Sequence, residues 1–138
     1  MSLVTAPAVP DVAAGVQPRP VTVVRDIFDP LGLDALSWES WAEPGRAGVD
    51  VHRLYTTDDA AGGAAMITRM APGAHGDLHE HLGHELIVVL DGELLNSNGD
   101  RYRPGDLVIE EPGSVHQVST ETGCTVLGIR HAPTRPAA

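Results

Sequence analysis

The stretch GAHGDLHEHLGHELIVVLDG, residues 73–92, places a histidine-rich segment directly before an apolar run. Its first half, from His75 to Glu85, holds four of the chain's 7 histidines and three carboxylates. Its second half contains ELIVVL, a short apolar run bounded by turn residues, which is typical of a buried strand. The stretch therefore predicts a strand that begins beside a polar cluster, and the cluster is either a metal site or a polar loop.

The spacing inside the cluster favours a metal site. If His79-Glu80-His81 is a strand, alternation places both histidines on one face about 7 Å apart and Glu80 on the other. Two imidazoles can then bind one ion. Glu85, at the start of the next strand, could add a carboxylate oxygen, and His116, after a Pro-Gly turn, could add a third nitrogen.

Short strands and sharp turns continue on both sides of this stretch. Upstream, VTVV (21–24) is β-branched, and DIFDPLGLDALS (26–37) has room for a single helical turn because proline and glycine interrupt it. VDVHRLYTT (49–57) and AAMITRMA (64–71) predict an antiparallel pair joined by the turn residues DDAAGG.

Downstream, Asp91-Gly92 and Asn98-Gly99 predict two hairpin turns. RPGD, EEPGS and ETG then separate the predicted strands LVIE, VHQVST and CTVLGIRH. Strands at this spacing, with no ten-residue amphipathic helix, indicate an all-β sandwich or barrel.

Composition limits the domain count and the partners. With 138 residues, 42% of them hydrophobic, the chain fits one domain, which we place at 21–134 after a flexible, proline-broken arm at 1–20. A net charge of −10 without any lysine argues against nucleic acid or an anionic membrane as partner. No apolar run is long enough for a membrane helix, so we expect a cytoplasmic protein. The lone Cys124 excludes an intrachain disulfide and a four-cysteine zinc site.

Two spaced motifs resemble those of the cupins. Gly73, His79, His81, Glu85 and Gly92 occupy every fixed position of the first cupin motif. The second runs from Gly105 through Glu111-Pro112-Gly113 and His116 to Thr120, with its proline displaced by one position and threonine in place of the final asparagine. The flanking WAEPGRAGVDVHRLY and GCTVLGIR resemble the subgroup of ChrR-type anti-sigma factors and acetylacetone-type dioxygenases.

This resemblance implies a small double-stranded β-helix, the jelly-roll barrel of the cupins, and a homodimer. It also implies that His79, His81, Glu85 and His116 bind one divalent metal inside the barrel. Such a nitrogen and oxygen donor set suits Fe(II), Mn, Ni, Cu or Zn, and affinity order alone does not choose among them. Four protein ligands on an octahedral ion leave two positions for a small-molecule substrate or ligand.

Three functions are open at this point. The first is a metal-dependent enzyme, similar to a dioxygenase, that acts on a small carbonyl or enol compound coordinated to the metal. The second is a non-catalytic sensor of metal or small ligand. Anti-sigma sensors carry a separate helical zinc domain, and the arm at 1–20 has neither histidine nor cysteine, which favours a free-standing protein. We therefore favour the enzyme over the sensor. The third is an isomerase or cyclase in which the metal is a Lewis acid.

The remaining reactive residues have no spacing partner, and we predict other roles for them. His75 and His84 adjoin the motif and suit loop or supporting roles, His84 more so. For Cys124 we expect core packing. Arg69 and Arg130 could each bind an acidic substrate, although we expect both at the surface. We assign no role to His52 and His131.

Overall fold

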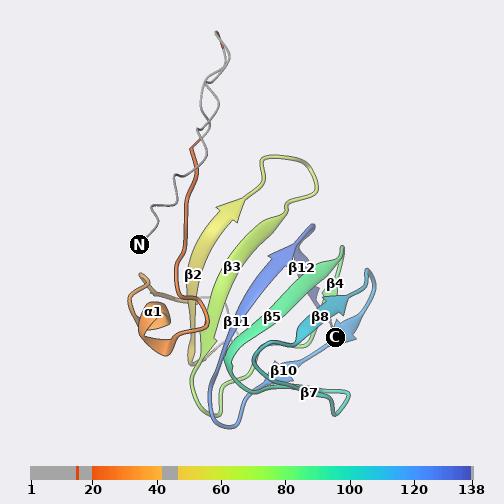
Figure 1. The fold of residues 1–138 in the computed structure, drawn as a ribbon. Coiled ribbons are helices and arrows are strands. Elements are labelled where there is room, and N and C mark those ends of the chain that lie inside the picture. Colours follow the sequence, from red (N-terminus) through yellow and green to blue (C-terminus); the bar gives the residue numbers. More distant parts are fainter. Residues whose placement is uncertain (1–14, 16–19, 42–46, 138) are drawn as a thin grey trace, which may run out of the picture.

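The computed structural model describes residues 15, 20–41 and 47–137, and most of these lie in strands and turns. The all-β prediction is confirmed, and the chain folds as a double-stranded β-helix (Figure 1). The elements, in chain order, are α1 (Pro30–Asp34), β1 (Glu39–Ser40), β2 (Val49–Thr56), β3 (Ala64–Met70), β4 (His79–His81), β5 (Glu85–Gly92), β6 (Leu94–Asn96), β7 (Arg101–Tyr102), β8 (Leu107–Glu110), β9 (Val115–His116), β10 (Val118–Ser119), β11 (Cys124–Arg130) and β12 (Thr134–Pro136).

Six strands form one large antiparallel sheet in the order β1-β2-β3-β11-β5-β8. The predicted pair at 49–57 and 64–71 is confirmed as β2 and β3, which align Val51 opposite Thr68. Late in the chain, β11 inserts between β3 and β5 and pairs with both. Figure 1 shows this sheet as a curved row of strands running from β2 to β8.

Two smaller sheets of three strands complete the fold, in the orders β10-β6-β7 and β12-β4-β9. The second of these contains both strands that carry the motif histidines, β4 and β9. It also contains β12, which the sequence analysis did not predict and which pairs along the whole of β4. The histidine strand therefore has a hydrogen-bonded neighbour on each side.

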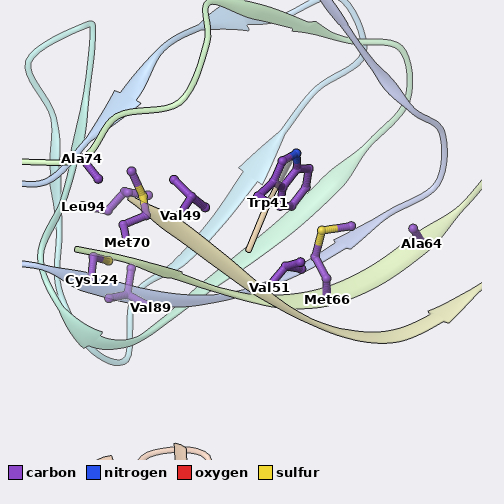
Figure 2. Packing of buried hydrophobic residues seen from close by; sticks show 10 residues of the cluster. All are labelled: Trp41, Val49, Val51, Ala64, Met66, Met70, Ala74, Val89, Leu94 and Cys124. Carbon is purple, nitrogen blue, oxygen red and sulfur yellow. The ribbon is translucent and has the colours of Figure 1, made fainter. Parts of the chain in front are cut away.

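The large sheet has apolar side chains on both faces. Alternation along β3 sends Met66 to the inner face and Ile67 to the outer face. Figure 2 shows the inner cluster, in which Met66, Val51 and Trp41 lie above the strands of the large sheet. On the outer face, Ile67 packs with Leu33 of α1, so the short helix covers part of the sheet that would otherwise face water.

The predicted helical turn is confirmed as the five-residue α1. Proline at its first position has no hydrogen-bond donor to lose there, and the side chain of Asp29 caps the turn by accepting from the backbone N–H of Leu31 at 3.0 Å. The strand suggested by VTVV is wrong, because residues 21–24 form no strand. Val24 instead packs on the outer apolar cluster beside α1.

Two predictions about turns and strands are also wrong. Asp91-Gly92 is no hairpin turn, because β5 runs through Gly92 and the following β6 pairs with β7 and β10, not with β5. VHQVST is not one strand, because it breaks at Gln117 into β9 and β10, which belong to different sheets. In both places the chain crosses from one sheet to another. The Asn98-Gly99 hairpin is confirmed as the β6–β7 connection.

Almost all of the arm predicted at 1–20 lies outside the described residues, as do residues 42–46 of the loop before β2. Within the described ranges, no helix has the length and apolar character needed to cross a membrane.

Candidate metal centre

The strand β4 presents His79 and His81 to the interior. Both side chains are buried, at 6% and 2% exposure. Glu80 between them faces outward and pairs with Arg135 of β12 at 2.9 Å. The alternation predicted for His-x-His is therefore present, with two imidazoles on the inner face of one strand.

A turn in a later part of the chain brings His116 next to His79 and His81. Residues 112 and 113 close the turn before β9, where the N–H of Gly113 donates to the carbonyl of His81 at 2.7 Å. The N–H of His81 in turn donates to the carbonyl of Ser114 at 2.9 Å. This turn therefore fixes β9 against β4, with His116 as the direct cross-strand partner of His79.

The three imidazoles meet at their Nε2 atoms. The Nε2 of His116 lies 2.9 Å from that of His81 and 3.1 Å from that of His79. With metal–nitrogen bonds of about 2.1 Å, ligands at right angles stand about 3.0 Å apart and tetrahedral ligands about 3.4 Å apart. The two measured spacings thus suit neighbouring corners of an octahedron, and the group could hold a metal ion.

The groups behind the rings of His79 and His116 favour tautomers whose Nε2 lone pairs face the common centre. The Nδ1 of His79 lies 2.9 Å from the carbonyl of Asp77, which can only accept, so the proton is on Nδ1 and the Nε2 is bare. The Nδ1 of His116 lies 3.1 Å from a carboxylate oxygen of Glu110, which favours the same tautomer. Two lone pairs facing each other across 3.1 Å repel unless a cation lies between them. This donor set fits a metal ion.

Burial favours the neutral form of two of these rings, His81 and His116. The pKa of His81 is lowered to about 4, first by burial and then by the neighbouring imidazoles of His116 and His79 and the charge of Arg130. Burial also lowers the pKa of His116, although the nearby Glu110 opposes this shift. Because a metal binds the neutral imidazole, His81 and His116 need not lose a proton before an ion enters.

Glu85 reaches the same cavity from the large sheet. As predicted, it begins β5, directly after the turn that follows β4. Its Oε1 lies 3.8 Å from the Nδ1 of His81, and it is not among the three residues whose ligand atoms converge. Its side chain is 15% exposed and lies over Gly128 of β11, where the absence of a side chain leaves room for the carboxylate.

The sequence analysis missed Glu110, which supports the site from behind. Glu110 ends β8, is 8% exposed, and places Oε1 at 3.1 Å from the Nδ1 of His116, although not in line for a hydrogen bond. Its other oxygen accepts from the hydroxyl of Ser114 at 3.1 Å. A carboxylate on the far nitrogen of a ligand histidine orients the ring and raises its basicity. The sequence LVIE could not have revealed it, because the structure buries Glu110 and leaves Leu107 and Ile109 exposed on β8.

Replacing Glu110 by glutamine should lower zinc affinity about 10- to 100-fold, because His116 loses its carboxylate neighbour. Competition with a chromophoric zinc chelator measures this effect. The next residue provides a matched control, since Glu111 is exposed and its carboxylate pairs with His84 at 2.9 Å on the surface. Equal affinities in Glu110→Gln and Glu111→Gln would show that Glu110 does not support the site.

A cavity of about 90 Å³ lies beside the histidines, between the large sheet and β4-β9. The polar residues in its wall include His79, His116, Glu85 and Arg130. Its floor belongs to the inner apolar cluster, including Trp41 and Met66 (Figure 2). Since one water needs roughly 10–15 Å³ measured in this way, the space suits a small organic molecule.

Several other predicted residues lie away from the cavity. The exposed His84 pairs with Glu111, His52 contacts the carbonyl of Ser37, and Arg69 pairs with Asp34 at 2.9 Å while lying over the ring of Trp38. His75 and His131 are exposed. Cys124 packs in the core as predicted, and burial raises the pKa of its thiol to about 12. Arg130 differs from the expectation of surface exposure, because it lines the cavity.

The departure at the end of the second motif leaves the site intact. Thr120, where the motif has asparagine, is 2% exposed and donates from Oγ1 to the carbonyl of Glu93 at 2.8 Å. The same oxygen accepts from the N–H of Gly123 at 3.0 Å. The threonine thus anchors the turn before β11 and has no contact with the histidines.

Comparison with known proteins identifies the family. A family model described as the ChrR cupin-like domain matches residues 31–133, which include both histidine motifs. The chain belongs to this family of cupins. No curated protein matches it. Among solved structures, this chain is similar to the anti-sigma factor ChrR of Rhodobacter sphaeroides, solved in complex with SigE, at 26% identity and a TM-score of 0.59. That match covers 71% of this chain and 50% of the ChrR chain, so this chain spans about half of its relative's length.

Two enzymes share the fold. The acetylacetone dioxygenase of Acinetobacter johnsonii is similar with a TM-score of 0.71 at 11% identity, over 94% of this chain and 85% of that one. The polyketide cyclase RemF of Streptomyces resistomycificus gives a TM-score of 0.61 at 21% identity, over 76% of this chain and 82% of that one. At these identities the likeness shows a common fold alone. The structural neighbours of this chain thus include two enzymes and one anti-sigma factor.

Proposed function

We propose that this protein is a metal-dependent cupin enzyme, similar to a dioxygenase, which acts on a small carbonyl or enol compound. The observation that carries the proposal is the convergence of three buried imidazoles beside a small cavity with an apolar floor. His79, His81 and His116 would hold one divalent ion, and Glu85 would provide the fourth ligand by turning its carboxylate from His81 toward the Nε2 atoms.

Each part of the cavity has a task in this proposal. The ion, when bound, supplies redox or Lewis-acid chemistry and leaves coordination positions for a substrate oxygen. Trp41, Met66 and the apolar wall exclude water and hold the carbon skeleton of the substrate. Glu110 keeps the ring of His116 in place. The net charge of −10 supports a small-molecule partner over nucleic acid. A cytoplasmic location stays a prediction. The homodimer implied by the cupin resemblance stays a prediction.

Oxygen uptake by two metal forms tests this function. With Fe(II), the full-length protein should consume dioxygen in the presence of a β-dicarbonyl or hydroxyaryl ketone, and with zinc it should bind the same compound without uptake, because zinc has no accessible redox change. An oxygen electrode measures the rate, and difference spectra of the zinc form measure binding. His116→Ala, reconstituted in the same way, controls for iron that is free in solution.

Two alternative functions correspond to different results of this experiment. A non-catalytic sensor is supported by the 26% identity to ChrR, and an absence of uptake across a broad substrate panel would favour it. Equal substrate conversion by the iron and zinc forms would favour an isomerase or cyclase in which the metal is only a Lewis acid.

A further inference from the structure

Arg130 occupies the inner face of β11 at the cavity. Along this strand, Val126, Gly128 and Arg130 point inward at every second position, and all three line the cavity with the histidines. The cross-strand partners of Arg130 are Ala64 on β3 and Glu85 on β5. Because alanine is small, the guanidinium has space toward the cavity rather than being packed against a large neighbour.

The charge of Arg130 lacks a counterion among the residues that the structure describes. Arg69, Arg101 and Arg135 each form an ion pair with a carboxylate, and Arg130 forms none with any described residue. Its Nε is buried and has no hydrogen-bond partner within the same part of the chain. A buried guanidinium nitrogen without a partner costs free energy, so its presence at a cavity wall points to a ligand that supplies one.

The cross-strand partner of Arg130 on β5, Glu85, directs its carboxylate toward His81. Glu85 has its Oε1 at 3.8 Å from the Nδ1 of His81, and its Oε2 lies over Gly128. Glu85 is therefore close to His81, and no ion pair joins it to Arg130 among the described residues. The wall of the cavity thus contains both histidines that suit a metal and the cation of Arg130.

We propose that Arg130 binds the carboxylate of a small oxo acid whose carbonyl oxygen faces the three histidines. The planar fork of a guanidinium donates two parallel hydrogen bonds to a carboxylate, which fixes the orientation of the ligand as well as its charge. This inference rests on the proposed function for the metal, and it narrows the substrate class from carbonyl compounds in general to anionic ones.

Two ligands of nearly equal shape but different charge test whether Arg130 recognises the charge of the ligand. Acetoacetate has a carboxylate oxygen where acetylacetone has a methyl group. Calorimetric titration of the full-length, zinc-loaded protein should show that acetoacetate binds. Arg130→Gln should weaken acetoacetate at least about tenfold and acetylacetone less than about twofold, because only the acid loses a charge-assisted pair. Arg130→Lys should recover part of the affinity.

Arg101→Gln is the matched control, since it removes the same charge from an exposed site where Arg101 pairs with Glu93 at 2.7 Å. It should leave both affinities unchanged. No acetoacetate binding to the wild type, or an equal loss for both ligands in Arg130→Gln, overturns the proposal. Selective loss of acetoacetate combined with no oxygen uptake by the iron form would sustain Arg130 as the anion site and refute the dioxygenase function, so the two failures are distinguishable.

Discussion

Alanine in place of His116 should reduce zinc or iron affinity on the order of a thousandfold, and His79→Ala should do the same. Each change removes one of three nitrogens that meet within 4.8 Å, and no other histidine in the described ranges is close enough to replace it. The measurement is elemental analysis of each purified variant after dialysis against a mild chelator, compared with about one ion per chain in the wild type.

His84→Ala is the control for this loss. His84 lies in the same histidine-rich stretch, but its ring is exposed and pairs with Glu111 at 2.9 Å. This variant should keep its metal. Full metal retention in His79→Ala or His116→Ala would refute the site, whereas circular dichroism shows whether a variant that lost its ion has kept its strands.

Gly92→Ala should destabilise the protein by about 3 kcal/mol or more, which is roughly a 10 °C fall in Tm. Gly92 ends β5 with a φ of +75°, and an added Cβ would overlap the carbonyl oxygen of Gly123 and lie 2.9 Å from the Cα of Cys124. Both obstacles are backbone of the adjoining turn and strand, so neither can rotate away as a side chain would.

Gly99→Ala separates this clash from backbone strain alone. Gly99 has a φ of +95° in the β6–β7 hairpin, with no heavy atom within 4 Å of the added methyl position. It should cost only about 1–2 kcal/mol, the price of a left-handed L residue. Urea unfolding of both variants in one metal state decides the matter, and equal losses would mean that close packing of Gly92 on Gly123 contributes nothing.

These two glycines, Gly99 and Gly92, show where sequence reasoning about the fold succeeds and where it fails. Asn98-Gly99 predicted its hairpin correctly because both paired strands adjoin the turn. Asp91-Gly92 carries an equally strong local signal, but β5 pairs with β8 and with β11, which begins only at Cys124. A partner so distant leaves no mark on the residues of the turn. The break of VHQVST at Gln117 is hidden for the same reason.

The candidate site divides in the same way. The spacing of His79 and His81 predicts their shared face from strand geometry, and the cupin resemblance adds His116. Glu110 and Arg130 belong to neither pattern. Each becomes visible only when the inner face of its strand is known, because alternation along LVIE or CTVLGIR says which residues share a face and not which face is inside.

The strands that carry the donors determine what a bound ion can hold together. The three histidines lie on β4 and β9, which are neighbours in one small sheet, whereas Glu85 lies on β5 in the large sheet. An ion on the histidines alone fastens strands that hydrogen bonds already join. An ion that also binds Glu85 would cross-link the small sheet to the large sheet. Carboxylate ligation would then set the distance between the two layers and with it the width of the cavity.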